Sequence, residues 1–196
     1  HLPAREVVAG FDESTTFNPG WLRKISRALV EGMRIVLPLA YSVGVGYAIV
    51  YSAMPYVEDD NWWGMSRHVA LCGALYGAGS MLLVLLLKWL LLGRYKPSAH
   101  PMWTPFVWCS EAVTNMYESM AVMSFLNYLR GTPMLPWAMR LFGAKIGHGV
   151  YLDTTDMTEF DCVSIGDHAE LNDLSGPQTH LFEDRIMKIG QVRIER

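Results

Sequence analysis

Cysteine is scarce in this sequence, and its spacing is irregular. The three cysteines, Cys72, Cys109 and Cys162, lie far apart, and none belongs to a set with zinc-ligand spacing. This pattern argues against a disulfide framework and predicts no metal site. A reduced compartment or burial in lipid suits such isolated thiols better.

A strong net charge is also missing. The formal net charge of −3 at pH 7 provides no electrostatic basis for binding nucleic acid. The glycines between Gly73 and Gly79 lack the Lys-Ser/Thr ending of a phosphate-binding loop, and no Gly-x-Ser-x-Gly elbow occurs. A nucleotide-hydrolysing P-loop domain and a serine hydrolase of the elbow type are therefore not expected.

Apolar residues, by contrast, are abundant at 51% of the chain. Two long runs, residues 35–54 and 69–92, contain a single charged residue between them, Lys88. About twenty apolar residues cross a bilayer core, so both runs are predicted to be transmembrane helices. Lys88 lies late enough to extend its amine to the membrane interface. The alternative is a helical hairpin buried inside a soluble domain.

The flanks of these runs predict an orientation. Residues 1–20 are expected to be a linker, and the helix that starts at Trp21 has a basic face suited to a membrane surface, with Arg23, Lys24 and Arg27. Basic residues flank both outer ends, whereas the connecting turn carries three acids. The positive-inside rule then places both outer ends, and the C-terminal half of the chain with them, on the cytoplasmic side of a multi-pass protein.

Residues 97–143 are predicted to form a proline- and tryptophan-rich connector followed by amphipathic helices. Helical spacing of apolar residues returns over residues 110–130, with Glu111 and Glu118 two turns apart on another face. The many methionines of this helix indicate adaptable packing rather than a cofactor site.

A six-residue repeat begins at Ile146. Leu152 follows Ile146 by six residues, and Leu171 follows Ile165 by the same interval. This period is typical of a left-handed parallel β-helix, in which each face takes six residues. Residues 144–196 supply little more than two coils. The predicted fold class is therefore α+β, a transmembrane helical hairpin followed by an incomplete left-handed parallel β-helix.

The repeat is interrupted by residues 178–188, which are predicted to be a loop ejected from the solenoid. Its histidine, His180, is the main catalytic candidate, because imidazole accepts a proton near neutral pH. Glu183 and Asp184 lie close to it in sequence, while Glu159 and Asp161 are candidates to approach it in space. Candidate donors to substrate or to an oxyanion are Asn172 and Gln178.

The alternative is that His180 is an ordinary loop residue without a catalytic role. The other histidines are less promising. His148 and His168 occupy equivalent repeat positions and are expected on the solenoid surface, and His68 and His100 flank the second apolar run, at the membrane interface.

Residues 143–167 and 178–188, together with 92–97 and 103–108, resemble the membrane-bound C-terminal region of nonribosomal peptide synthetases of the ε-poly-lysine synthetase type. The resemblance implies a bacterial inner-membrane location, and adenylation and carrier domains elsewhere in a larger polypeptide. It also implies 4'-phosphopantetheine on that carrier, whose aminoacyl thioester is joined to a free amine to build a short amino-acid polymer.

Thr179-His180 is also similar to the histidine loop of hexapeptide-repeat acetyltransferases, which implies a general-base role for His180 and a weaker substrate-binding role for Asn172. The preferred hypothesis is a membrane-anchored aminoacyltransferase segment with lipid, the carrier and adenylation domains and an amino acid as partners. A coenzyme A-dependent acetyltransferase and a non-catalytic membrane scaffold are the alternatives, and self-association into a homo-oligomer stays open.

Overall fold

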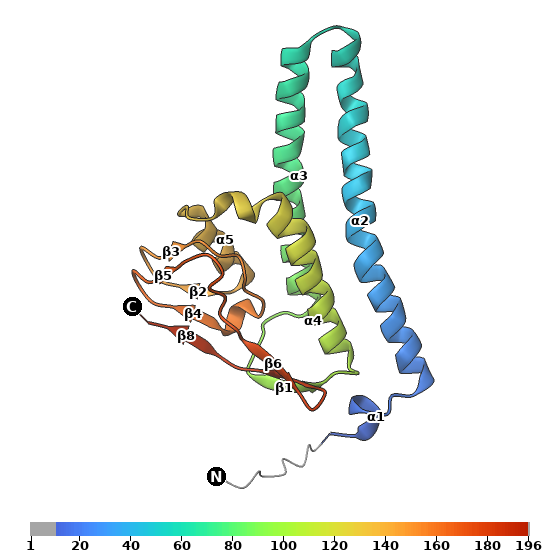
Figure 1. Cartoon of the computed structure of the whole chain (residues 1–196), viewed down its shortest axis with the longest axis vertical. Helices are drawn as coiled ribbons and strands as arrows, with labels where there is room; N and C mark the ends of the chain where they lie inside the picture. The colour runs from blue at the N-terminus through green and yellow to red at the C-terminus, as the bar shows by residue number, and fades with distance from the viewer. Residues whose placement is uncertain (1–10, 196) are drawn as a thin grey trace.

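The computed structural model describes residues 11–195, and a long helical hairpin stands beside a smaller unit of helices and strands (Figure 1). The predicted linker contains a short helix, α1 (Glu13–Thr16), which is capped by the Asp12 carboxylate accepting from the Ser14 amide at 3.0 Å. Residues 1–10 of that linker lie outside the described part of the chain.

The hairpin consists of α2 (Trp21–Glu58) and α3 (Trp62–Leu91). The expected surface helix and the first apolar run form one continuous helix, because no capping residue interrupts the sequence where they join. Tyr41 and Tyr76 stack across the hairpin with ring centroids 5.6 Å apart, and Ser42 hydrogen-bonds to Tyr76 at 2.9 Å.

Both helices are long and apolar enough to cross a membrane. Only 6% and 22% of their most apolar windows are buried in the chain. Most of the apolar surface of the hairpin is therefore exposed in the described structure. The alternative prediction, a helical hairpin buried inside a soluble domain, required this surface to be buried.

The predicted helix over residues 110–130 is broken into three pieces, the first two of which pack against α3. These are α4 (Pro105–Met116), a π-helix η1 (Tyr117–Val122) and a 3₁₀ turn η2 (Leu126–Leu129). A Cβ on Gly77 of α3 would lie 2.5 Å from the Ser124 carbonyl oxygen, so this glycine lets the chain between η1 and η2 lie directly on α3. Next comes α5 (Met134–Phe142), which ends at Gly143 in the left-handed conformation at φ 118°.

Five short strands pair in parallel. β4 (Val163–Ile165) lies between β2 (Lys145–Ile146) and β8 (Val192–Ile194), and β3 (Tyr151–Leu152) pairs with β5 (Glu170–Leu171). Ile146 is opposite Ile165, and Leu152 is opposite Leu171. The residues that the six-residue repeat predicted to be equivalent are therefore in register, and all four are buried.

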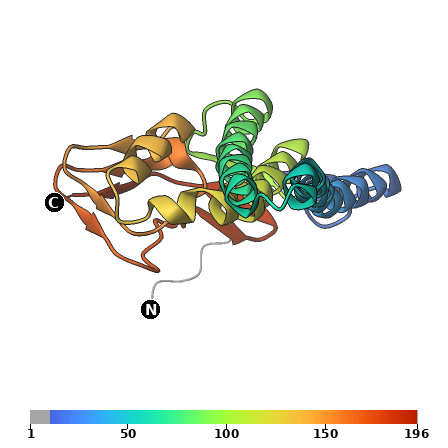
Figure 2. The same cartoon turned by 90° about the horizontal axis from the view of Figure 1, so that it is seen from above.

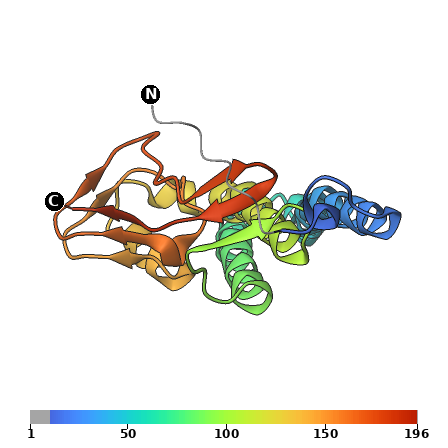
Figure 3. The same ribbon diagram turned by 90° about the horizontal axis from the view of Figure 1, so that it is seen from below.

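Residues 178–188 are not an irregular loop as predicted. They contain most of a β-hairpin of β6 (His180–Glu183) and β7 (Ile186–Ile189), whose turn residues Asp184 and Arg185 both have positive φ, 51° and 59°. Two such residues produce the twist that a tight hairpin needs. β1 (Ser98–Pro101), from the connector, pairs with β7 and completes the sheet, which lies near the lower ends of α3 and α4 (Figure 3).

The main core joins the elements of the smaller unit to the lower half of α3, and seen from above this unit lies to one side of the hairpin (Figure 2). Its largest fully buried apolar side chains come from η1, η2, α5, β3 and the turn before β4: Tyr117, Leu126, Leu135, Met139, Phe142, Leu152 and Met157. This packing places η1 and the turn before β4 side by side, and both contribute residues to the surroundings of His180.

The prediction that Lys88 extends its amine to the membrane interface is wrong. Its side chain is fully buried, and its Nζ lies 2.6 Å from Asp161 Oδ2. Asp161 belongs to the 3₁₀ turn η3 (Phe160–Cys162) and also accepts from the Tyr95 amide at 3.1 Å. The connector and η3 cover this part of α3, so an ion pair replaces the expected solvent contact.

Candidate active site

His180 stands at the first position of β6, and its ring is oriented by a buried carboxylate. The Nδ1 atom lies 2.9 Å from Glu159 Oε2. The side chain of Glu159 is 1% exposed and that of His180 is 24% exposed. A buried acid thus holds one ring nitrogen of a histidine whose other nitrogen, Nε2, has no hydrogen-bond partner among residues 11–195.

Glu159 is held by neighbours on both sides. Thr158 donates its hydroxyl to Glu159 Oε2 at 2.7 Å, and the Thr179 hydroxyl donates to the same oxygen. Burial raises the pKa of Glu159, but the hydrogen bonds from His180, Thr158 and Thr179 outweigh it and bring that pKa below its usual value. Glu159 is therefore ionised at neutral pH.

The hydrogen bond to Glu159 raises the pKa of His180, and burial opposes this effect only in part. An ionised Glu159 requires the proton of a neutral imidazole to sit on Nδ1. Nε2 is then left with a free electron pair, as in the general-base histidine of a hydrolase triad. The pair has the parts of a general-base dyad, with Glu159 fixing the tautomer.

The dyad opens into a groove of about 280 Å³ whose one side is mainly α4, with Arg34 of α2, and whose other side is the hairpin of β6 and β7. Phe182 shares the groove with His180, because alternate residues of a strand point to the same side, and their rings meet edge to face at 5.6 Å. The charged residues that line the groove come from α2, α4, η1, β6 and the turn before η3: Arg34, Glu111, Glu118, Glu159 and His180.

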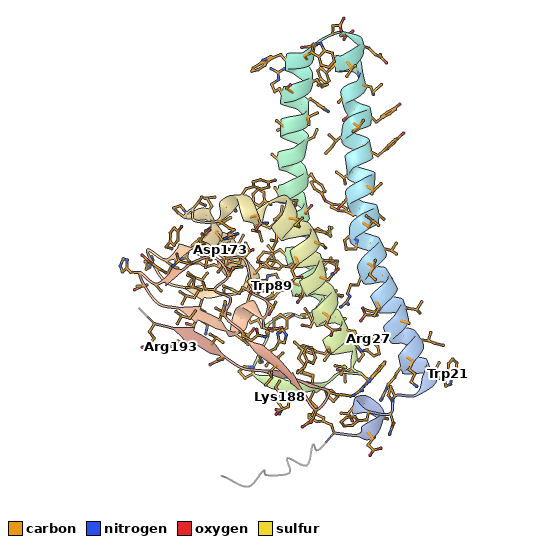
Figure 4. The ribbon with its side chains drawn as sticks, in the orientation of Figure 1. Trp21, Arg27, Trp89, Asp173, Lys188 and Arg193 are labelled. Atoms are coloured by element: carbon orange, nitrogen blue, oxygen red, sulfur yellow. The ribbon has the colours of Figure 1, made fainter. Side chains whose placement is uncertain are left out.

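One wall of the groove is an ion-pair network between α2 and α4. Arg27 lies 2.5 Å from Glu111 and 2.6 Å from Glu31, and Arg34 lies 2.7 Å from Glu31. Figure 4 shows Arg27 between the two helices. The sequence pattern placed Arg27 on a face exposed to the membrane surface, whereas the structure turns it toward α4, because Glu111 supplies a partner there.

Glu118 has no ion-pair partner within 4 Å in the described chain. Burial raises its pKa, and the negative charge of Asp156 adds to the effect. Glu111 and Glu118 were recognised in the sequence only as acids on one face of a helix. Their spacing of two helical turns indicated that both acids lie on one face of the helix. No pattern in the neighbouring sequence indicated that this face would contact β6.

The structure does not bring the other predicted catalytic residues to His180. Glu183 pairs with Lys188 across the β-hairpin, on the opposite side of β6 from His180. Asn172 is exposed after β5, and its carbonyl accepts from Ser175. Neither residue lines the groove.

The remaining candidates are accounted for by other contacts. Asp161 pairs with Lys88, Asp184 lies in the turn of the β-hairpin, and Gln178 donates to the His180 carbonyl at 3.0 Å. Of the four acids considered for the histidine, Glu159 is the partner.

The other histidines lie away from the groove. His148 and His168 are exposed, as predicted from their repeat positions. His100 stacks on Phe106 with ring centroids 3.9 Å apart, and His68 contacts Ser52 across the hairpin at 2.9 Å. Across residues 11–195, no group of three or more His, Cys, Asp or Glu side chains is arranged to hold a metal ion.

A pH dependence is expected from the dyad. Because the pKa of His180 is raised, the rate of a reaction that uses its neutral ring should fall on acidification at a pH above the ordinary histidine value of 6.5. Glu159→Gln should shift this acid limb toward lower pH and lower the plateau, since the carboxylate that stabilises the imidazolium is lost. A pH–rate profile for each protein measures both effects, and identical profiles would contradict the assignment.

The fold and the groove define a mixed helix-and-strand protein with two helices that are long enough for a membrane and a His–Glu pair at their lower end. No family model matches the chain, and no solved structure matches it.

The sequence is 56% identical over 193 residues to the delta-poly-L-ornithine synthetase of Acinetobacter baumannii (strain AB307-0294). The match covers 98% of this chain, and the chain spans 14% of the length of that relative. This identity confirms the predicted resemblance in part: the chain is similar to a segment of a poly-amino-acid synthetase.

Proposed function

We propose that this chain is part of a membrane-anchored poly-amino-acid synthetase and supplies a site that joins an aminoacyl thioester to an amine. The single observation that carries the proposal is the 2.9 Å contact between His180 Nδ1 and a buried Glu159 in an open groove. The 56% identity to a synthetase named for an ornithine polymer supports the same class of reaction.

In the proposed reaction, Glu159 holds the proton on Nδ1, and Nε2 of His180 takes a proton from the attacking amine. The amine nitrogen forms a bond to the thioester carbonyl carbon, and the carbon–sulfur bond then breaks. The imidazolium returns its proton to the leaving sulfur, which departs as a thiol. The products are one amide and one thiol, and the dyad returns to its starting state.

The charges of the groove favour a basic amino acid as the acceptor. Glu118 has no ion-pair partner within 4 Å in the described chain and faces the groove, so its carboxylate is suited to an ammonium group. A diamino acid carries such an ammonium group on its side chain, as does the ornithine in the name of the relative.

A carrier-bound donor fits the groove better than free coenzyme A. Phosphopantetheine would present the acyl group as a thioester, and the arm next to the sulfur is uncharged. Free coenzyme A adds nucleotide phosphates that require cations. In the described chain, the arginines beside the groove, Arg27 and Arg34, are already paired with Glu31 and Glu111.

We further propose that residues 144–194 are an incomplete left-handed β-helix from which the hairpin of β6 and β7 is an insertion. The in-register parallel pairs support this assignment. With α2 and α3 in the bacterial inner membrane and the strands on its cytoplasmic side, a carrier in the same polypeptide would reach the groove at roughly millimolar effective concentration.

The donor can be tested with the full-length parent protein. It should form labelled polymer from a radiolabelled basic amino acid and ATP without coenzyme A, because the carrier supplies the thioester. A variant of the parent whose carrier serine is replaced by alanine is the matched control and should form none. Product that requires added coenzyme A would overturn the carrier-bound donor.

A further inference from the structure

Four large apolar side chains form an exposed surface on the segment from η1 to α5. Met123, Tyr128, Met134 and Trp137 are each at least half exposed, from 53% for Trp137 to 77% for Tyr128. We call these residues the apolar cap. Four large apolar side chains exposed within one short segment are typical of a surface that meets a membrane or another protein.

The cap lies beside the part of α3 that would be inside a membrane. A groove of about 580 Å³ separates Gly73 and Tyr76 of α3 from Met123 and Tyr128. Gly77, which touches Ser124, follows Trp62 by fifteen residues, or about 22 Å at the rise of an α-helix. A bilayer core is about 30 Å thick, so a bilayer that begins near Trp62 would reach past this level.

The charge of the segment also fits a lipid environment. Between Glu118 and Arg140 the single charged residue is Arg130, whose guanidinium is bound by Asp153 and Asp173. Leu71, Leu75 and Leu82 of α3, at neighbouring levels of the hairpin, are also more than half exposed. Figure 1 shows the yellow segment of η1 and η2 beside the middle of the hairpin, above the strands.

We infer that the apolar cap is embedded among the acyl chains of the bilayer that α2 and α3 cross. The inference rests on the proposed function only in that it takes these helices to be membrane spans. Lipid, rather than a second protein, is the occupant because Met123 and Tyr128 lie beside a level of α3 that falls within a bilayer core, and the single charged residue nearby, Arg130, is paired. Segments that enter one leaflet in this way commonly sink about 5–10 Å below the headgroups.

This arrangement places the groove of His180 at the membrane surface. Arg34, which lines the groove, immediately precedes the uncharged stretch of α2 at residues 35–57. The cap would therefore lie in the leaflet while the groove opens at headgroup level. Two separate attachments, the hairpin and the cap, would fix the orientation of the strands relative to the membrane.

Spin labels at single cysteines test the inference. Cys72, Cys109 and Cys162 are first replaced by alanine, and labels are then placed by Leu75→Cys on α3, Tyr128→Cys in the cap and Arg193→Cys on β8. All three positions are exposed, so the labels should not disturb packing. The chain is reconstituted in phosphatidylethanolamine–phosphatidylglycerol vesicles, and the collision rates with oxygen and with a nickel chelate are measured.

We expect the ratio of oxygen to nickel collisions to be several-fold higher at positions 75 and 128 than at position 193. A lipid-type ratio at 75 with a water-type ratio at 128 would overturn the inference and leave the membrane anchor intact. A label at 128 shielded from both reagents would assign the cap to a protein partner and also overturn it. A water-type ratio at 75 would refute the anchor itself, and the inference with it.

Discussion

His180→Ala should lower the rate of polymer formation by the full-length parent by about 10²–10⁴-fold, the usual contribution of a general base. The ring is the only group of the described chain that combines a free nitrogen in the groove with a carboxylate holding the other nitrogen. Product length and rate can be followed by mass spectrometry and by incorporation of labelled amino acid. Folding should be little affected, because the His180 side chain is only partly buried.

His168→Ala is the matched control for this experiment, because His168 is an exposed histidine that does not line the groove, and its loss should leave the rate unchanged. Thioester loading of the carrier should be normal in both variants, which separates loss of amide formation from loss of amino-acid activation. A His180→Ala parent that produces polymer at a near-normal rate would favour the scaffold hypothesis.

Lys88→Met should destabilise the chain by about 3–5 kcal/mol, because it leaves a carboxylate without its counter-ion in a protein interior. The Lys88 side chain is fully buried and that of Asp161 is 10% exposed, and the two lie 2.6 Å apart. The free energy of unfolding in detergent micelles, measured by denaturant titration with a tryptophan fluorescence readout, would report the loss.

The double variant Lys88→Met, Asp161→Leu should recover much of that loss, because removing both charges of a buried pair is often close to neutral. The interaction energy from the double-mutant cycle should therefore be large. Additive effects of the two single substitutions would show that the two side chains do not form a pair. Since Asp161 follows Glu159 by two residues, the single variant should also displace Glu159 and lower the rate of the parent.

The buried pair connects the proposed anchor to the proposed chemistry. Lys88 belongs to α3, whereas Asp161 lies in η3, directly after Glu159 and Phe160. The ion pair of Arg27 with Glu111 of α4 fixes the other hairpin helix, α2, beside the groove. Both helices of the hairpin are therefore attached to the walls of the groove, so substitutions in the anchor are expected to alter the pH–rate profile.

Local patterns in the sequence were sufficient for much of the fold. The two apolar runs predicted the two long helices, because about twenty consecutive apolar residues have the length and composition of a helix that crosses a bilayer. The spacing of Ile146, Leu152, Ile165 and Leu171 predicted which strand residues stand opposite each other, since a repeat in sequence becomes a repeat in space. His180 was recognised because it interrupts that repeat.

The tertiary structure decided the partners. Glu159 is 21 residues from His180, and Glu183 lies nearer along the chain but on the wrong side of its strand. Glu111 of α4 and Glu118 of η1 reach the groove only because both elements pack on α3 and turn this face toward β6. Lys88 is buried only because the connector returns over α3. The sequence alone determined the helices and the repeated strands, because their pattern depends on residues close together in the chain. The hydrogen bonds and ion pairs of the site join residues distant in the chain, so they depended on how those elements pack.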